Sequence, residues 1–154
     1  PERRYFGIGR KKRTHTVIEP KSAFPVFTVK DLDEARSFYT ENFGFDLVFS
    51  GDWYIHLVSR SGVQVGFLLP DQPTQPPIFQ KAYPGEGVIF SLEVEDADAA
   101  FAVAKSNSLK IVLDLRSEDW GQRHFCVEDP NGISLDIVQS FEPTEEYQTD
   151  YVTE

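Results

Sequence analysis

The sequence predicts an α+β fold in which two βαβββ modules form a joined, curved mixed sheet with a cleft on one face. Two observations carry this prediction. The stretch 121–138 alternates apolar and polar residues on both sides of the turn Asp129-Pro130-Asn131-Gly132, which is typical of a β-hairpin. Five prolines fall within residues 70–87, and the pattern that precedes this stretch starts again after it.

The first module begins with a strand at residues 24–29. Asp31 is placed to cap a helix, and Glu34, three residues later, can complete a capping box. The helix is expected over residues 32–42 and ends at Phe43-Gly44. Three strand-like runs follow, at residues 45–50, 53–60 and 63–69.

The second module repeats this order. A strand is expected at residues 88–94, a helix capped by Glu95-Asp96 runs through Asn107, and a strand at 110–115 precedes the hairpin. Residues 29–31 match residues 94–96 at an offset of 65, and residues 55–62 match 125–132 at an offset of 70. The two offsets differ by five residues, which corresponds to one loop insertion in the second module.

The chain therefore divides into five segments. They are a basic N-terminal arm (1–22), the first module (23–70), a proline-rich linker (71–87), the second module (88–140) and an acidic C-terminal tail (141–154). The arm is interpreted as a solvated leader or a segment that packs on the acidic body; the alternative is an anion-binding arm.

Charge and composition limit the partners. Residues 1–21 carry seven Lys or Arg and two Glu, so the total charge of −10 leaves −15 for the rest of the chain. An acidic body argues against nucleic acid and anionic membranes and favours neutral or cationic small molecules. A single cysteine excludes a disulfide framework and suggests a cytoplasmic location. No apolar run approaches the roughly 20 residues of a membrane helix.

Two motifs carry a family resemblance. The pattern V-x-D-L-x-x-A-x-x-F-Y spans residues 29–39, and G-Q-R-x-F-x-V-x-D-P-x-G spans residues 121–132. Together with the repeat, they resemble the vicinal oxygen chelate superfamily, which includes glyoxalase I, extradiol dioxygenases, fosfomycin-resistance enzymes and bleomycin-binding resistance proteins. The resemblance covers about residues 23–139. It implies that two subunits pair and complete their clefts across a two-fold axis, so we expect a homodimer.

The resemblance also locates the metal ligands of the family's enzymes. These enzymes place a His on the first strand of each module and a Glu or similar ligand on the last. The corresponding residues here are Phe24, Gly66, Ile89 and Asp136. Three of these four cannot bind a metal, and one carboxylate does not make a site. We therefore expect no metal and no cofactor, as in the bleomycin-resistance branch, which sequesters its ligand without turnover.

Strand alternation predicts which residues face the cleft. The candidate ligand-binding residues are Tyr54, His56, Glu93, Trp120, His124, Cys126 and Asp136. Glu93 and Asp136 are the carboxylates of this set, so a cationic, planar compound is expected to lie between them. Either tryptophan could be part of the core or stack on the ligand; the core is favoured for Trp53, and neither position is favoured for Trp120.

Three alternatives stay open at this stage. His124, Cys126 and Asp136 could form a substitute metal site, which would favour a glyoxalase-like lyase, isomerase or dioxygenase. His124 and Cys126 could instead act as a base and a thiolate nucleophile, although an inert buried cysteine is the commoner case. The chain could also be an interaction module, since the fold alone does not decide among these functions.

Overall fold

The computed structural model describes residues 17–152, and it confirms the α+β fold with two βαβββ modules. The elements of the first module are β1 (Val26–Thr28), α1 (Leu32–Phe43), β2 (Asp46–Ser50), β3 (Tyr54–Val58) and β4 (Gln64–Leu68). Those of the second are β5 (Ile89–Glu93), α2 (Ala97–Ser106), β6 (Lys110–Glu118), β7 (Gln122–Glu128) and β8 (Ser134–Ser140).

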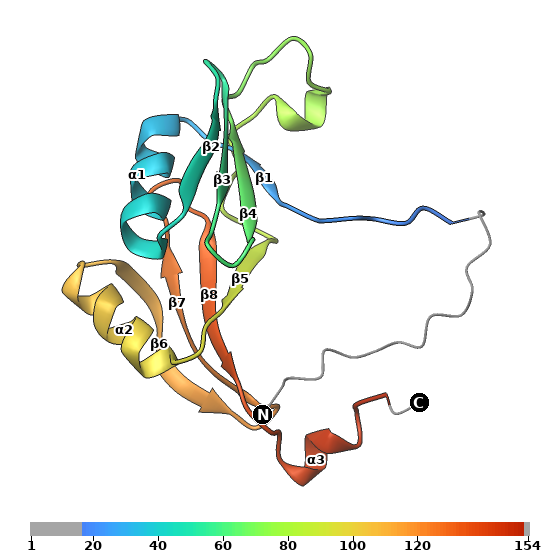
Figure 1. Ribbon diagram of the computed structural model, residues 1–154, viewed down its shortest axis with the longest axis vertical. Helices are drawn as coiled ribbons and strands as arrows, with labels where there is room; N and C mark the ends of the chain where they lie inside the picture. Colours follow the sequence, from blue (N-terminus) through green and yellow to red (C-terminus); the bar gives the residue numbers. More distant parts are fainter. Residues whose placement is uncertain (1–16, 153–154) are drawn as a thin grey trace.

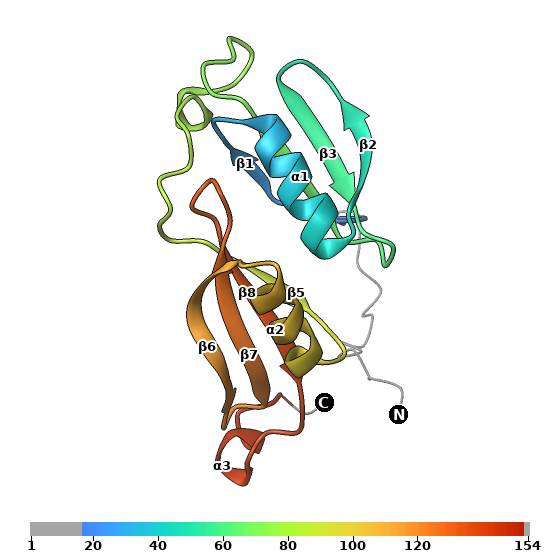
Figure 2. The ribbon, with the colours of Figure 1, turned by 90° about the vertical axis from the view of Figure 1, so that its left-hand side faces the viewer.

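Each module forms its own four-stranded sheet. The strand orders are β1-β4-β3-β2 and β5-β8-β7-β6, and within each sheet the first pair is parallel while the others are antiparallel. Figure 1 shows α1 and α2 on the same side of the strands, and Figure 2 shows the two modules one above the other with both helices toward the viewer. The faces opposite the helices therefore point in a common direction.

Local sequence signals set the helix ends. Asp31 accepts a hydrogen bond from the Glu34 backbone N–H at 2.9 Å, and Asp96 accepts one from the Ala99 N–H at 3.0 Å, so both predicted caps are confirmed. At the end of α1, Gly44 adopts a left-handed conformation with φ of 65°, which a residue without Cβ adopts at little cost.

Alternation along the strands separates a buried face from an open face. In β7, Phe125 and Val127 are buried under α2, and in β3, Ile55 and Leu57 are buried under α1. These residues belong to a single hydrophobic cluster that includes side chains of both modules. The residues between them therefore face away from the helices, as the sequence predicts.

Side chains join the two sheets, which remain separate hydrogen-bonded ladders within residues 17–152. The Tyr39 hydroxyl of α1 donates to Asp129 Oδ2, in the β7–β8 turn, at 3.0 Å. Phe27 and Phe90 lie with ring centroids 6.2 Å apart. Asn107 donates to Asn42 Oδ1 at 3.0 Å where the C-terminal ends of the helices meet.

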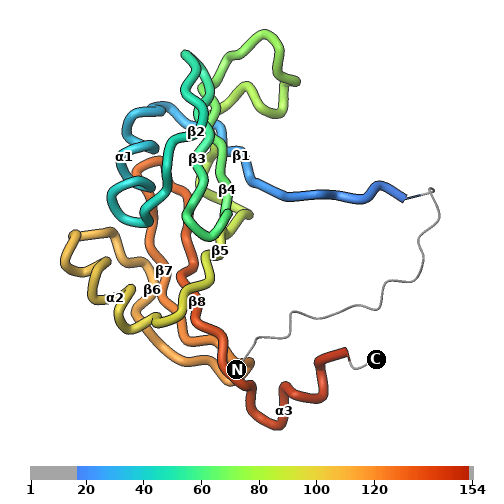
Figure 3. Tube along the Cα trace, in the orientation of Figure 1, coloured from blue at the N-terminus to red at the C-terminus, as the bar shows by residue number. Residues whose placement is uncertain are grey.

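The connecting segments are more ordered than their composition suggests. The linker contains a 3₁₀ turn, η1 (Pro77–Phe79), and the acidic tail contains a short helix, α3 (Glu145–Gln148). Figure 3 follows the linker from β4 to β5 and the segment that precedes β1. Residues 1–16 of the predicted basic arm lie outside the described residues. Within the described part, no helix is both long and apolar enough to cross a membrane.

The contact between Tyr39 and Asp129 generates a stability prediction. Tyr39→Phe removes a hydroxyl that is fully buried and leaves a carboxylate oxygen without its partner, so it should lower the free energy of unfolding by about 1–3 kcal/mol. Urea unfolding followed by circular dichroism measures this. Tyr83→Phe is the matched control, because the Tyr83 hydroxyl makes an exposed bond to Val88 O. Equal stability of the Tyr39→Phe variant and the parent would contradict the prediction.

Candidate functional site

The open faces of the two sheets carry equivalent sets of residues. In the first module His56 lies opposite Gly66 and Tyr54 opposite Leu68. In the second, Cys126 lies opposite Asp136 and His124 opposite Val138, each position being 70 residues further along the chain. The register thus places Tyr54, His56 and Gly66 where the second module has His124, Cys126 and Asp136.

The first module holds a cavity of about 760 Å³. Its ten lining residues come from the open face of the sheet, the loops beside it and the linker, and all are uncharged. They are Phe24, Val26, Thr28, Phe49, Gly51, Trp53, Tyr54, Leu68, Gln75 and Phe79. Five of the ten are aromatic, so the cavity offers several flat apolar surfaces within one space.

A row of hydrogen-bonded side chains, Tyr54, His56 and Gln64, ends at this cavity with Tyr54. The Tyr54 hydroxyl lies 2.7 Å from His56 Nδ1, and His56 Nε2 lies 2.8 Å from Gln64 Oε1. With the Nε2 proton directed to the Gln64 carbonyl, Nδ1 accepts from the Tyr54 hydroxyl. The phenol oxygen then keeps lone pairs that can accept a hydrogen bond from a ligand. Burial raises the pKa of Tyr54, so the group stays neutral at physiological pH.

The family's metal positions in this module do not fit a metal. A Cβ at Gly66 would lie 2.3 Å from the Tyr54 hydroxyl, because the tyrosine ring fills the space over the glycine. Phe24 packs its ring against His56 at a centroid distance of 4.9 Å. Neither position offers a ligand atom, and aromatic rings take up the space beside both of them.

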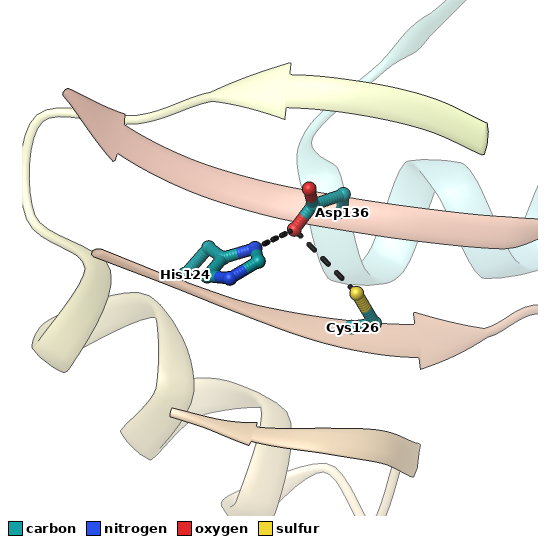
Figure 4. A group of neighbouring side chains, drawn as sticks. All are labelled: His124, Cys126 and Asp136. Carbon is teal, nitrogen blue, oxygen red and sulfur yellow. Dashed lines mark hydrogen bonds and ion pairs between the residues drawn. The ribbon is translucent and has the colours of Figure 1, made fainter. Parts of the chain in front are cut away.

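The second module brings three potential ligand atoms together (Figure 4). His124 Nδ1 lies 2.8 Å from Asp136 Oδ1, and the Cys126 thiol donates to the same oxygen at 3.5 Å. The three ligand atoms all lie within 4.8 Å of one another. His124 is only 7% exposed, while Cys126 and Asp136 are partly buried.

Two further residues hold the His124 ring. Glu118 Oε1 lies 3.2 Å from His124 Nε2, so both ring nitrogens face carboxylate oxygens. Arg116 forms an ion pair with the same Glu118 oxygen. Trp120 packs edge-on to His124 at a centroid distance of 6.3 Å and donates from Nε1 to Gln122 at 2.9 Å.

The surroundings of Cys126 do not activate a nucleophile. Burial and the negative charge of Asp136 raise the pKa of the Cys126 thiol to about 11. A reactive cysteine requires the opposite environment, one that stabilises the thiolate near neutral pH. The structure therefore disfavours the thiolate-nucleophile alternative.

The candidate residues thus fall into two groups, one on each module. Tyr54 lines the aromatic cavity and His56 is hydrogen-bonded to it, whereas Trp120, His124, Cys126 and Asp136 lie together on the second sheet. Glu93 is on β5, beside Val138 of β8 and on the same face as Asp136. The prediction that Trp53 belongs to the core was wrong: the residue is 40% exposed and lines the cavity, just before the start of β3.

Sequence reasoning missed several residues of both groups. Glu118 was missed because β6 was expected to end at Leu115, although the strand continues to residue 118. Phe79 was missed because the linker was treated only as a connection. Phe49 lies on an edge strand next to a register shift, where simple alternation does not predict its direction. Residues 116–119 are all polar, so alternation gave no signal for Glu118.

Comparisons with solved structures show the same fold. A superfamily member from Sphaerobacter thermophilus aligns with a TM-score of 0.65 and 22% identity, over 80% of this chain and 100% of that one. A lactoylglutathione lyase from Agrobacterium tumefaciens aligns with a TM-score of 0.63 and 18% identity, over 78% of this chain and 94% of that one. A bleomycin resistance determinant encoded on transposon Tn5 aligns with a TM-score of 0.59 and 19% identity, over 79% of this chain and 98% of that one.

The comparison with curated proteins finds no match. The family described as "Glyoxalase/Bleomycin resistance protein/Dioxygenase superfamily" matches residues 15–137. This match spans both modules and the linker between them. The chain belongs to the glyoxalase/bleomycin resistance protein/dioxygenase superfamily.

Proposed function

We propose that this chain is a metal-independent small-molecule-binding protein that sequesters a planar, cationic compound in the cavity of its first module. The cavity itself carries the proposal. It is large enough for a drug-sized ligand, and aromatic side chains make up half of its ten lining residues. Similarity in fold to the Tn5 bleomycin resistance determinant is compatible with ligand binding, and similarity in fold to a lyase is equally compatible with catalysis. The fold alone therefore does not decide the function.

The aromatic lining explains a preference for a flat ligand. Phe49 and Tyr54 lie with ring centroids 6.0 Å apart, and Trp53 and Tyr54 with centroids 6.4 Å apart. A planar ligand that packs against these rings gains apolar burial together with the offset or edge contacts that π-systems favour. Because rigid rings lose little conformational freedom, the site is largely formed before the ligand arrives.

Three features favour a cation. The chain outside residues 1–21 carries a charge of −15, which attracts cations over long range. Aromatic faces stabilise a desolvated positive charge through their quadrupoles. The Tyr54 oxygen, which donates its own proton to His56, can accept from a ligand N–H. Glu93 and Asp136 do not line this cavity. Their predicted contact with the cation is untested and is not part of this proposal.

Metal independence rests on the occupied family positions. In the first module these positions hold a phenylalanine packed on His56 and a glycine covered by Tyr54. Recognition in this cavity therefore uses stacking and one hydrogen bond. The free thiol of Cys126 suits a reducing compartment, and we propose that the protein works in the cytoplasm.

The two tryptophans allow the site to be located by fluorescence. Trp53 lines the cavity and Trp120 lies on the second module, and each is 40% exposed. A planar cationic dye such as ethidium should quench the Trp120→Phe variant, in which Trp53 remains, and should leave the Trp53→Phe variant largely unquenched. Tyr54→Phe, which removes one hydrogen-bond acceptor, should weaken binding by about fivefold.

Controls separate this proposal from its rivals. Quenching should be unchanged in EDTA, and a planar anionic dye of similar size should bind more weakly. Loss of dye binding in EDTA would refute metal independence. Quenching of Trp120 alone would place the ligand on the second module, and equal affinity for the anionic dye would refute the cation preference.

Gly66 provides a second test through Tyr54. Gly66→Ala places a methyl group 2.3 Å from the Tyr54 hydroxyl, so it should lower the free energy of unfolding by about 1–3 kcal/mol and weaken dye binding. In a Tyr54→Ala background the same substitution has space, so its effect on stability should be much smaller. A double-mutant cycle from urea unfolding measures this coupling. Additive effects would show that Tyr54 does not occupy the space over Gly66.

We also propose that the protein is a homodimer. Val88 and Ile89 at the edge strand β5 are 48% and 66% exposed, and Val26 of the edge strand β1 is 45% exposed. Light scattering at micromolar concentration should give twice the mass of one chain, and Ile89→Glu should reduce it. Ile78→Glu, at an exposed isoleucine of the linker, is the matched control. A monomer mass for the parent would contradict the proposal.

A further inference from the structure

We propose that His124, Cys126 and Asp136 form a binding site for one Zn²⁺ ion, separate from the ligand cavity of the first module. The three residues supply nitrogen, sulfur and oxygen from paired strands, two from β7 and one from β8. None of them lines the aromatic cavity. The inference therefore goes beyond the proposed function and does not rest on it.

The distances suit a small tetrahedral cation. Ligands bound to Zn²⁺ at about 2.0–2.3 Å in tetrahedral geometry lie roughly 3.3–3.8 Å from one another. Here the separations from Asp136 Oδ1 are 2.8 Å to His124 Nδ1 and 3.5 Å to Cys126 Sγ, and all three atoms lie within 4.8 Å of each other. Side-chain rotations that move these atoms by up to about 1 Å would bring all three to coordinating distance.

The mixture of donor atoms selects the metal. A thiolate and an imidazole favour Zn²⁺ over Mg²⁺ and Ca²⁺, which prefer oxygen ligands. When Zn²⁺ binds, the proton of the Cys126 thiol is released to solvent and the sulfur coordinates as the thiolate. Three protein ligands leave one position for water or a small-molecule donor.

Glu118 provides an independent argument for the site. Metal-binding histidines usually direct their second ring nitrogen to a carboxylate, which fixes the tautomer and the ring orientation. Glu118 Oε1 lies 3.2 Å from His124 Nε2, on the side of the ring away from Cys126 and Asp136, and Arg116 holds Glu118 in place. In the metal-free protein the hydrogen bond between His124 and Asp136 holds a proton between Nδ1 and the carboxylate. When a metal binds, Nδ1 coordinates it without that proton, while Glu118 holds the proton on Nε2.

The family's metal enzymes do not use this combination of residues. Asp136 alone occupies a position that corresponds to one of their ligands, while His124 and Cys126 come from the neighbouring strand. The equivalent trio of the first module, Tyr54, His56 and Gly66, includes one imidazole and no carboxylate. The repeat thus places the aromatic cavity on one sheet and the proposed metal site on the other.

The test uses the full chain, stripped with chelator, dialysed and titrated with Co²⁺ as a spectroscopic substitute for Zn²⁺. The parent should bind about one equivalent and show a sulfur-to-cobalt charge-transfer band, which Zn²⁺ should displace. Cys126→Ser should abolish the band, and Asp136→Asn should weaken binding by about tenfold or more. Glu118→Gln should weaken binding by about 10- to 100-fold while keeping the band.

His56→Gln is the matched control, since His56 occupies the equivalent strand of the first module. His15→Gln is a second control for the remaining histidine of the chain, which lies outside the described residues. Both variants should keep the band and the stoichiometry, and Zn²⁺ should raise the melting temperature of the parent and of both controls but not of Cys126→Ser. The absence of a charge-transfer band in the parent, or unchanged Zn²⁺ affinity in Cys126→Ser, would overturn the proposal. The three residues would then form only a hydrogen-bonded row.

Discussion

The hydrogen bond from Tyr39 to Asp129 is the contact on which the arrangement of the two modules depends. Asp129 Oδ1 accepts from the backbone N–H groups of Asn131 and Ile133 at 2.8 Å each, which closes the β7–β8 turn. Its other oxygen accepts from the Tyr39 hydroxyl of the first module. Burial raises the pKa of Asp129, and these three donors offset the cost of keeping a carboxylate there. One side chain thereby shapes the hairpin of the second module and attaches it to α1 of the first.

This attachment orients both open faces. Tyr39 is fully buried between Phe67, at a centroid distance of 5.0 Å, and Phe45, at 5.9 Å, so the ring cannot move without disturbing the first sheet. The turn that it holds continues directly into β7 and β8, which carry His124, Cys126 and Asp136. Because no backbone ladder joins the two sheets within residues 17–152, their relative orientation depends on such side-chain contacts.

The sequence predicted what is determined locally. Alternation identified the open-face residues of β3, β7 and β8, and the caps at Asp31 and Asp96 follow from chemistry within three residues. It could not predict the Tyr39–Asp129 contact, which joins positions 90 residues apart. Nor could it predict that Trp53 lines a cavity, because a tryptophan beside a strand fits a core equally well. The sequence also could not predict that the Tyr54 ring lies over Gly66, because alternation gives the face a side chain is on and not the direction in which its ring points.

The repeat explains why the two sheets differ in chemistry while sharing a backbone. Positions 66 and 136 are equivalent in the two modules. Gly66 pairs with His56, two residues after Tyr54, and Asp136 pairs with Cys126, two residues after His124. Where the position is glycine, the ring of Tyr54 lies over it and its hydroxyl turns to His56, so an aromatic wall forms. Where the position is aspartate, its carboxylate draws His124 and Cys126 into one polar cluster. The presence or absence of a single carboxylate at this position therefore separates an apolar binding surface from a cluster of metal-binding groups.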